Sequence, residues 1–245
     1  MNGPGARPPG VSPAHVHRTW RFVELRFEGA VTQTRMLRWA PDLLWTSYTR
    51  SMLAALWLHP APRRVGIIGL GGGAQPKFLH RHFPQLDVEV VENNAAVLGL
   101  REAFRVPADD ARLRVVAGDG ADWLQQRAGA FDVLLVDAYD AGGIPPHLGS
   151  AGFYADCHAA LSADGVMAAN LYDTDLRQHR AYLAQAFGRS SLMLPEPDMS
   201  NQVAFAWRGV PAPPDAATWL GALPRAVRWQ LRGGVRRLAR AWASH

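Results

Sequence analysis

The chain has 245 residues, and 48% of them are hydrophobic, which allows one domain with a small appendage or two small domains. Its apolar runs are far too short to span a bilayer. A single cysteine, Cys157, excludes an internal disulfide framework and agrees with a reducing cytoplasm, the location we expect.

The first 60 residues divide into a leader and a small folded unit. Residues 1–17 are rich in glycine and proline, lack the apolar segment of a signal peptide, and are predicted to be disordered. In residues 18–60, apolar and charged side chains first alternate and then meet a turn at Gly29–Ala30, which predicts a β-hairpin. A helix is expected over 41–58, since Pro41 is a typical helix start.

Residues 61–210 alternate between apolar strands and helical segments. The predicted strands are "RVGIIGL", "DVEVVE", "LRVVAG", "FDVLLVD" and "GVMAANL", and the helices lie near 74–83, 94–104, 120–128, 150–162 and 175–188. Alternation of this kind predicts an α/β fold with a doubly wound parallel sheet. Two further apolar strands flank "PEPDMSN" and predict a final antiparallel hairpin. The expected fold is a Rossmann-like, class I methyltransferase-type sheet of seven mostly parallel strands.

Residues 211–245 form a basic tail that ends in an amphipathic helical pattern. Its arginines alternate with apolar residues at helical spacing, although Gly233 and Gly234 weaken a helix. We expect a terminal helix packed on the domain with solvated arginines. Weak contact with an anionic membrane surface is the alternative. Nucleic acid is not an expected partner, because no basic stripe interleaved with aromatic residues occurs outside the tail.

The stretch "VGIIGLGGGAQPKF" ends an apolar strand in glycines and then becomes helical. Gly69, Gly71 and Gly73 permit a tight turn and close approach of the backbone to a ligand. Glu92 ends the next strand about 20 residues later, where an acid commonly accepts hydrogen bonds from ribose hydroxyls. A nucleoside site is therefore expected, and the loop alone leaves open whether the ligand is NAD or an adenosyl-sulfonium compound.

Further acids follow the third and fourth strands. Asp119 and Gly120 stand in "AGDGADW", where the carboxylate can accept a hydrogen bond from an adenine amino group or cap the next helix. Asp137 and Asp140 stand three residues apart in "VDAYDAGGIPPHL", with Tyr139 between them. Paired acids at a strand end suit the binding of a cation and the removal of its proton. The histidines show no metal-ligand spacing.

With these motifs, the run from about residue 31 to residue 208 resembles the spermidine synthase (polyamine aminopropyltransferase) family. The matching stretches are "IGLGGGA", "VVENN", "GDGADWL", "FDVLLVDAYDAGGIPPHL", "GFYADCHAALSADGVMAANL" and "NQVAFAWRG". The resemblance implies transfer of an aminopropyl group from decarboxylated S-adenosylmethionine to a diamine such as putrescine. It also implies a homodimer and a reaction without a metal.

The resemblance also implies roles for individual residues. Glu92 holds the ribose, and Asp119 holds the adenine end. Asp137 is the base that helps to deprotonate the attacking amine, and Asp140 helps to hold the cationic substrate. Tyr48 and Tyr139 belong to the substrate-binding set, and the glycine loop, including Gly72, binds the donor.

This chain departs from the family pattern at two places. The glycine loop of the family commonly contains an aspartate that meets the aminopropyl ammonium, and Gly72 occupies its position here. The family's Tyr-His-Glu run is "SYTR", which keeps only Tyr48. A methyltransferase that uses S-adenosylmethionine itself is therefore an alternative, as is an adenosyl-binding module without activity. Lys77, the only lysine, is expected to be a solvated surface residue.

Overall fold

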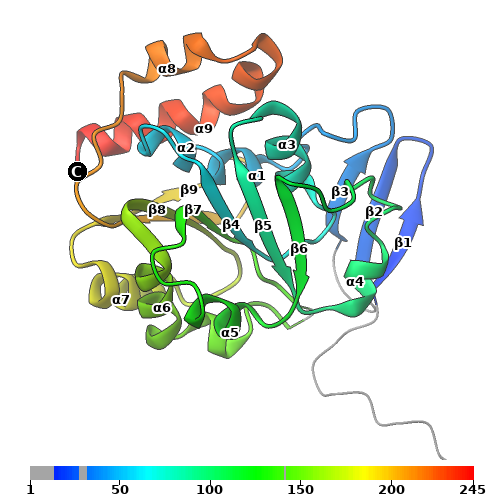
Figure 1. Ribbon diagram of the computed structural model, residues 1–245, viewed down its shortest axis with the longest axis horizontal. Coiled ribbons are helices and arrows are strands. Elements are labelled where there is room, and N and C mark those ends of the chain that lie inside the picture. The colour runs from blue at the N-terminus through cyan, green and yellow to red at the C-terminus, as the bar shows by residue number, and fades with distance from the viewer. Residues whose placement is uncertain (1–13, 28–31, 141) are drawn as a thin grey trace, which may run out of the picture.

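The computed structural model describes residues 14–27, 32–140 and 142–245, which form two sheets and the helices packed around them (Figure 1). Most of the predicted leader, up to residue 13, and the predicted turn at Gly29–Ala30 lie outside the described residues. Among the residues that are described, no helix combines the length and apolar character needed to cross a membrane.

The smaller sheet is antiparallel and lies at the N-terminal end of the chain. Its strands, in the order β1-β2-β3, are β1 (Ala14–Arg18), β2 (Phe22–Phe27) and β3 (Thr32–Leu37). The pairing of β2 with β3 confirms the predicted hairpin. The prediction of disorder up to residue 17 is wrong from Ala14 onward. Ala14 and Val16 pack against the core, and the strand depends on its backbone pairing with β2, which local composition does not reveal.

The predicted long helix over 41–58 is two short helices, α1 (Ser47–Met52) and α2 (Ala55–Leu58). Helix formation at Pro41 does not occur, because tertiary contacts hold the following residues in turns. The side chain of Asp42 pairs with Arg81, and the backbone N–H of Leu44 donates to Gln230 at 2.7 Å. The second contact holds the residues that precede α1 against the C-terminal part of the chain.

The larger sheet has seven strands in the order β6-β5-β4-β7-β8-β10-β9. The strands are β4 (Arg64–Ile68), β5 (Asp87–Glu92), β6 (Leu113–Ala117), β7 (Phe131–Val136), β8 (Leu161–Leu171), β9 (Ser191–Pro195) and β10 (Gln202–Trp207). The first five in spatial order are parallel, whereas β10 pairs antiparallel with both β8 and β9. The predicted α/β class, the mostly parallel sheet and the terminal hairpin are confirmed.

Helices cover both faces of the larger sheet (Figure 1). One face carries α5 (Gly120–Gln125), α6 (Ala151–Ala160) and α7 (Leu176–Phe187). The other carries α1 and α2 with α3 (Ala74–His82), α8 (Ala216–Ala222) and α9 (Arg225–Ala243). A 3₁₀ turn, Pro146–Gly149, precedes α6, and α4 (Ala95–Gly99) follows β5. Residues 101–105 form turns and not the predicted end of a longer helix.

The basic tail is an ordered part of the domain. The apolar stripe of helix α9 is completely buried. It is made of Val227, Leu231, Val235 and Leu238. Gly234 has a packing role, because a Cβ there would lie 2.9 Å from Cα of Ser51 in α1. The expectation of a packed terminal helix is therefore confirmed, and its apolar face is buried within the domain.

Lys77 corrects a further expectation, because it is 2% exposed and not solvated. Its Nζ donates to the carbonyl of Phe104 at 2.7 Å and lies 3.2 Å from the sulfur of Met36. Burial lowers the pKa of Lys77 to about 8, while Asp42 raises it and Arg105 lowers it. The ammonium thus ties α3 to the turns that follow α4, in a place that disfavours its charge.

We expect this buried lysine to make the stability of the protein rise with pH above about 8. Between that value and the pKa of the unfolded chain, the unfolded state binds a proton that the folded state has lost. Urea unfolding at pH 7.5 and about 9.5 should therefore give a larger gain in stability for the wild type than for Lys77→Met. Titration of the buried Cys157 contributes equally to both proteins, so parallel pH dependences would contradict the prediction.

Candidate functional site

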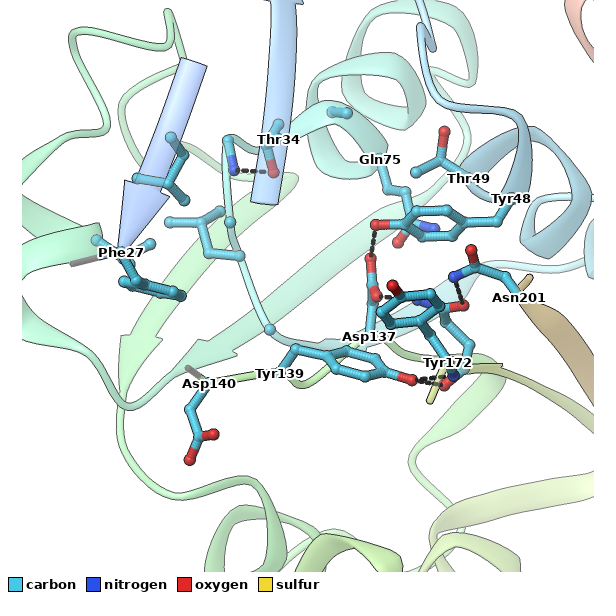
Figure 2. A pocket seen from close by; sticks show the side chains of 18 of the residues that line it. Phe27, Thr34, Tyr48, Thr49, Gln75, Asp137, Tyr139, Asp140, Tyr172 and Asn201 are labelled. Carbon is cyan, nitrogen blue, oxygen red and sulfur yellow. Dashed lines mark hydrogen bonds between the residues drawn. The ribbon is translucent and has the colours of Figure 1, made fainter. Parts of the chain in front are cut away.

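A cavity of about 730 Å³ opens at the carboxyl ends of the parallel strands, where the N-terminal sheet faces the larger one (Figure 2). Ligands of doubly wound sheets bind at this edge. Its walls come from β2 and β3, from α1, from the glycine loop, from the ends of β5, β7 and β8, and from the turn between β9 and β10. Most predicted site residues line it, namely Tyr48, Gly69, Gly71, Gly72, Glu92, Asp137, Tyr139 and Asp140.

The glycine loop brings the ends of β4 and β7 together. Gly69 has φ of +95°, and a Cβ there would lie 2.3 Å from the carbonyl oxygen of Asp137. Only glycine allows both this conformation and this approach. Gly73 begins α3 in the left-handed conformation, but it does not line the cavity.

Glu92 fastens the end of β5 to the glycine loop. Its two carboxylate oxygens accept hydrogen bonds from the backbone N–H groups of Leu70 and Asn94, each at 2.8 Å. Glu92 is 8% exposed and lines the cavity. Each carboxylate oxygen retains a further lone pair, so the group can also accept hydrogen bonds from ligand hydroxyls.

Asp137 lies at the centre of a hydrogen-bonded chain of side chains. The hydroxyl of Tyr48 donates to one carboxylate oxygen at 3.1 Å, and the Nδ2 of Asn170 donates to the other at 2.9 Å. Asn201 in turn donates to the Oδ1 of Asn170 at 2.8 Å. Burial raises the pKa of Asp137, and the bonds from Asn170 and Tyr48 oppose this rise. The carboxylate is therefore held in place by two hydrogen bonds and is more basic than that of an ordinary aspartate.

Tyr139 and Asp140 behave differently from each other. The hydroxyl of Tyr139 donates to the carbonyl of Asn170 at 3.0 Å and accepts from the N–H of Tyr172 at 2.6 Å, which anchors the end of β8. Asp140 accepts from the N–H of Gly142 at 2.7 Å, and Figure 2 shows its side chain pointing away from Asp137. The two acids therefore line one cavity at separate places.

Asp119 and Gly120 do not line the cavity in this structure. The carboxylate of Asp119 caps α5 through the N–H groups of Ala121 and Asp122 and accepts from His147 at 2.8 Å. Burial raises the pKa of Asp119, but these hydrogen bonds outweigh it and hold the pKa below its usual value. The helix-cap interpretation is confirmed, and contact with adenine stays a prediction.

Gly72 stands where the family commonly has an aspartate, and other residues fill the space of that side chain. A Cβ at Gly72 would lie 2.5 Å from Cγ2 of Thr34 and 3.0 Å from the ring of Phe104. Leu25 and Phe27 line the same cavity from β2. In this chain, Thr34 of the N-terminal sheet and Phe104 thus pack against the loop where that side chain would stand.

Several residues that line the site are not among the predicted site residues, for example Asn170, Asn201, Asp198 and Thr34. A signal existed for Asn170 alone, because it stands near the carboxyl end of the fifth predicted strand. Asp173 also lines the cavity, while Asp175 caps α7.

The charge of the cavity has one sign. Five carboxylates line it, those of Glu92, Asp137, Asp140, Asp173 and Asp198, whereas none of the described lysines, arginines and histidines does. A cavity of this kind attracts cations, even though the chain as a whole is positive. In the described ranges, no group of three or more His, Cys, Asp or Glu side chains could hold a metal ion.

Comparison with known proteins shows the family to which the chain belongs. The spermine/spermidine synthase domain family matches residues 47–191. The chain belongs to this family. The polyamine aminopropyltransferases of Chromobacterium violaceum and Neisseria meningitidis serogroup A are 31% and 30% identical to it over 175 residues. The match covers 70% of this chain, 67% of the first relative and 66% of the second, so it spans about two thirds of their length.

Solved structures similar to this family member confirm the fold. A probable spermidine synthase from Corynebacterium glutamicum has a TM-score of 0.68 at 17% identity, covering 79% of this chain and 76% of that one. A spermidine synthase in complex with the transition-state analogue AdoDATO has a TM-score of 0.63 at 20% identity, covering 89% and 88%. Human methyltransferase-like protein 13 in complex with SAH has a TM-score of 0.64 at 22% identity, covering 78% and 93%. All three support the Rossmann-like methyltransferase-type fold.

Proposed function

We propose that the protein transfers an aminopropyl group from decarboxylated S-adenosylmethionine to a small amine such as putrescine. The observation that carries this proposal is the held carboxylate of Asp137 in a cavity lined by five acids and by none of the described basic residues. Both substrates of this reaction are cations, and the family membership points to the same chemistry. The proposal includes a homodimer, which the family resemblance implies.

The proposed reaction begins with the attacking amine, whose reference pKa is about 10.4, so it arrives protonated at neutral pH. Asp137 accepts that proton, and burial favours this because it raises the pKa of the carboxyl group. The free amine then attacks the donor carbon beside the sulfur. The new C–N bond forms as the C–S bond breaks, and the bonding electrons leave on sulfur, which turns the sulfonium into neutral methylthioadenosine.

Other residues bind and orient the two substrates in this proposal. Glu92 accepts hydrogen bonds from the ribose, and the backbone of the glycine loop lies against the donor. Asp119 meets the adenine after giving up its contact with His147. Tyr48 and Tyr139 shape the amine site, and Asp140 supplies negative charge. In-line placement of the amine and the sulfonium would contribute much of the rate.

Gly72 supports a second candidate function, a methyltransferase that uses S-adenosylmethionine. The space beside Gly72 holds Thr34 and Phe104 and offers no counter-charge for an aminopropyl ammonium. The donor's carboxylate, however, would find none of the described basic side chains in the cavity lining. An adenosyl-binding module without activity is the third candidate, and the held carboxylate of Asp137 argues against it.

Calorimetry with S-adenosylmethionine, its decarboxylated form and methylthioadenosine, followed by a product assay with putrescine, separates these candidates. Tight binding of the decarboxylated donor and formation of spermidine would support aminopropyl transfer. Preference for S-adenosylmethionine without spermidine would reject it in favour of methyl transfer. Binding of adenosyl compounds without any product would favour the inactive module.

Tyr48→Phe should move the acidic limb of the pH profile of kcat/KM to higher pH. The tyrosine hydroxyl lowers the pKa of Asp137, so its loss leaves the rise caused by burial less opposed. The carboxylate then becomes protonated, and inactive as a base, at a higher pH than in the wild type. Tyr182→Phe, in α7 and outside the lining of the cavity, is the control. A limb that stays in place would contradict the role given to Tyr48.

A further inference from the structure

Arg237 differs from the other arginines of the basic tail. It lies on α9, and its guanidinium donates to the Oγ of Ser51 at 2.7 Å and to the Oε1 of Glu196 at 2.8 Å. The side chain of Glu196 is completely buried. Separation of this ion pair would leave a buried carboxylate without a charged partner, which is strongly destabilising. The pair therefore restrains both side chains. Arg237 thus joins α1 to the turn between β9 and β10, two segments that are far apart in sequence.

The contact between Arg237 and Ser51 is connected to one carboxylate oxygen of Asp137 through α1. Ser51 lies one helical turn after Tyr48 in α1, and Tyr48 donates to the carboxylate of Asp137 at 3.1 Å. The close packing of Gly234 against the backbone of Ser51 brings α9 within reach of the same turn. The position of α1, and with it the Tyr48 hydroxyl, therefore depends on α9.

The second contact leads to the other side of Asp137. Glu196 begins the turn between β9 and β10, and its N–H donates to the carbonyl of Asn201 at 2.9 Å, which closes the turn. Asn201 then donates to Asn170, and Asn170 donates to Asp137. Asn201 and Asn170 are buried. A shift of Glu196 would pass along this chain of buried groups to the carboxylate.

We propose that Arg237 is a positioning residue for Asp137, because it holds both segments whose side chains fix the two carboxylate oxygens. This inference rests on the proposed base role of Asp137. It gives the basic tail a function inside the molecule. Arg237 lies outside the segment, residues 47–191, that matches the family.

The test compares three variants with the wild type. Arg237→Met/Glu196→Met removes both buried charges together, since removal of one alone would leave the other without a partner and could unfold the chain. Ser51→Ala cuts only the contact with α1 and keeps the ion pair. Arg236→Met, an exposed neighbour on the same helix, is the matched control.

The double variant should lower kcat about 10-fold or more, because small misplacements of catalytic groups cost up to about 100-fold. Its affinity for methylthioadenosine should stay within about twofold of wild type, since the glycine loop and Glu92 are untouched. Ser51→Ala should show a smaller loss of the same kind, and Arg236→Met none. An unchanged kcat in the double variant, or a loss matched by weaker binding of methylthioadenosine, would overturn the inference.

Hydrogen–deuterium exchange gives a readout that does not need activity. In the double variant, exchange should rise in residues 47–52 and 195–201 and stay unchanged in residues 74–82. If the wild type forms no product, the proposed function fails, and exchange alone decides whether Arg237 holds both segments. Unchanged exchange in the two segments would reject the positioning role.

Discussion

Asp137→Asn should lower kcat by about 10²–10⁴-fold, the usual contribution of a general base. The substitution keeps the size of the side chain and its position between Tyr48 and Asn170. It removes the group that is proposed to accept the proton from the attacking amine. Steady-state kinetics with putrescine and the decarboxylated donor would measure the loss.

Donor binding distinguishes a base from a residue that merely shapes the cavity. Calorimetry should give Asp137→Asn the wild-type affinity for methylthioadenosine, because Glu92 and the glycine loop are the residues proposed to hold the nucleoside. Asp140→Asn is the informative comparison, since Asp140 lies apart from the hydrogen-bonded chain and is proposed to supply charge. Its effect should fall mainly on the KM of the amine. Equal losses of turnover and donor affinity in Asp137→Asn would contradict the base role.

Gly72→Asp should lower the free energy of unfolding by about 1–3 kcal/mol, the usual cost of overpacking. The new Cβ would lie 2.5 Å from Cγ2 of Thr34 and 3.0 Å from the ring of Phe104, so these neighbours would have to move. Thr34→Ser removes the methyl group responsible for the shorter contact and keeps the hydroxyl. Urea unfolding of the two single variants and the double variant measures the coupling between the positions.

The double variant Thr34→Ser/Gly72→Asp should recover much of that stability. It should also bind decarboxylated S-adenosylmethionine more tightly than the wild type does, because a carboxylate then faces the ammonium of the donor's aminopropyl group. Methylthioadenosine lacks the aminopropyl group and serves as the control, and its affinity should be unchanged. No recovery of stability would show that the contact between Thr34 and residue 72 does not limit the site. Unchanged donor affinity would show that the donor's aminopropyl group does not bind beside residue 72.

The parallel sheet and the placement of the main acids could be predicted from the sequence. Apolar strands alternating with helices leave few topologies, and the carboxyl ends of parallel strands meet at one edge. Glu92 ends β5 and Asp137 follows β7, the two strands that flank β4, and both residues line the cavity. Asp119 follows another strand of the sheet, yet its contact with His147 and its helix cap keep it out of the lining in this structure.

The errors in the sequence analysis share a physical origin. Lysine is usually found at the surface of proteins. Lys77 is tolerated in the interior because its ammonium donates a hydrogen bond to the carbonyl of Phe104. The predicted helix start at Pro41 is overridden by the contact between Leu44 and Gln230, which are 186 residues apart in sequence. In both cases a partner distant in the chain outweighs a local preference.

By itself, the sequence determined the fold class, and it predicted the sheet edge at which the cavity opens and the acid, Asp137, that lines it there. These follow from periodicity and from residue type at strand ends, which are local properties of the chain. Only the tertiary structure decided what holds Asp137, what fills the space beside Gly72 and why Arg237 differs from its neighbours. Each of these depends on a buried polar or steric contact between segments far apart in sequence, and burial exists only once the chain has folded.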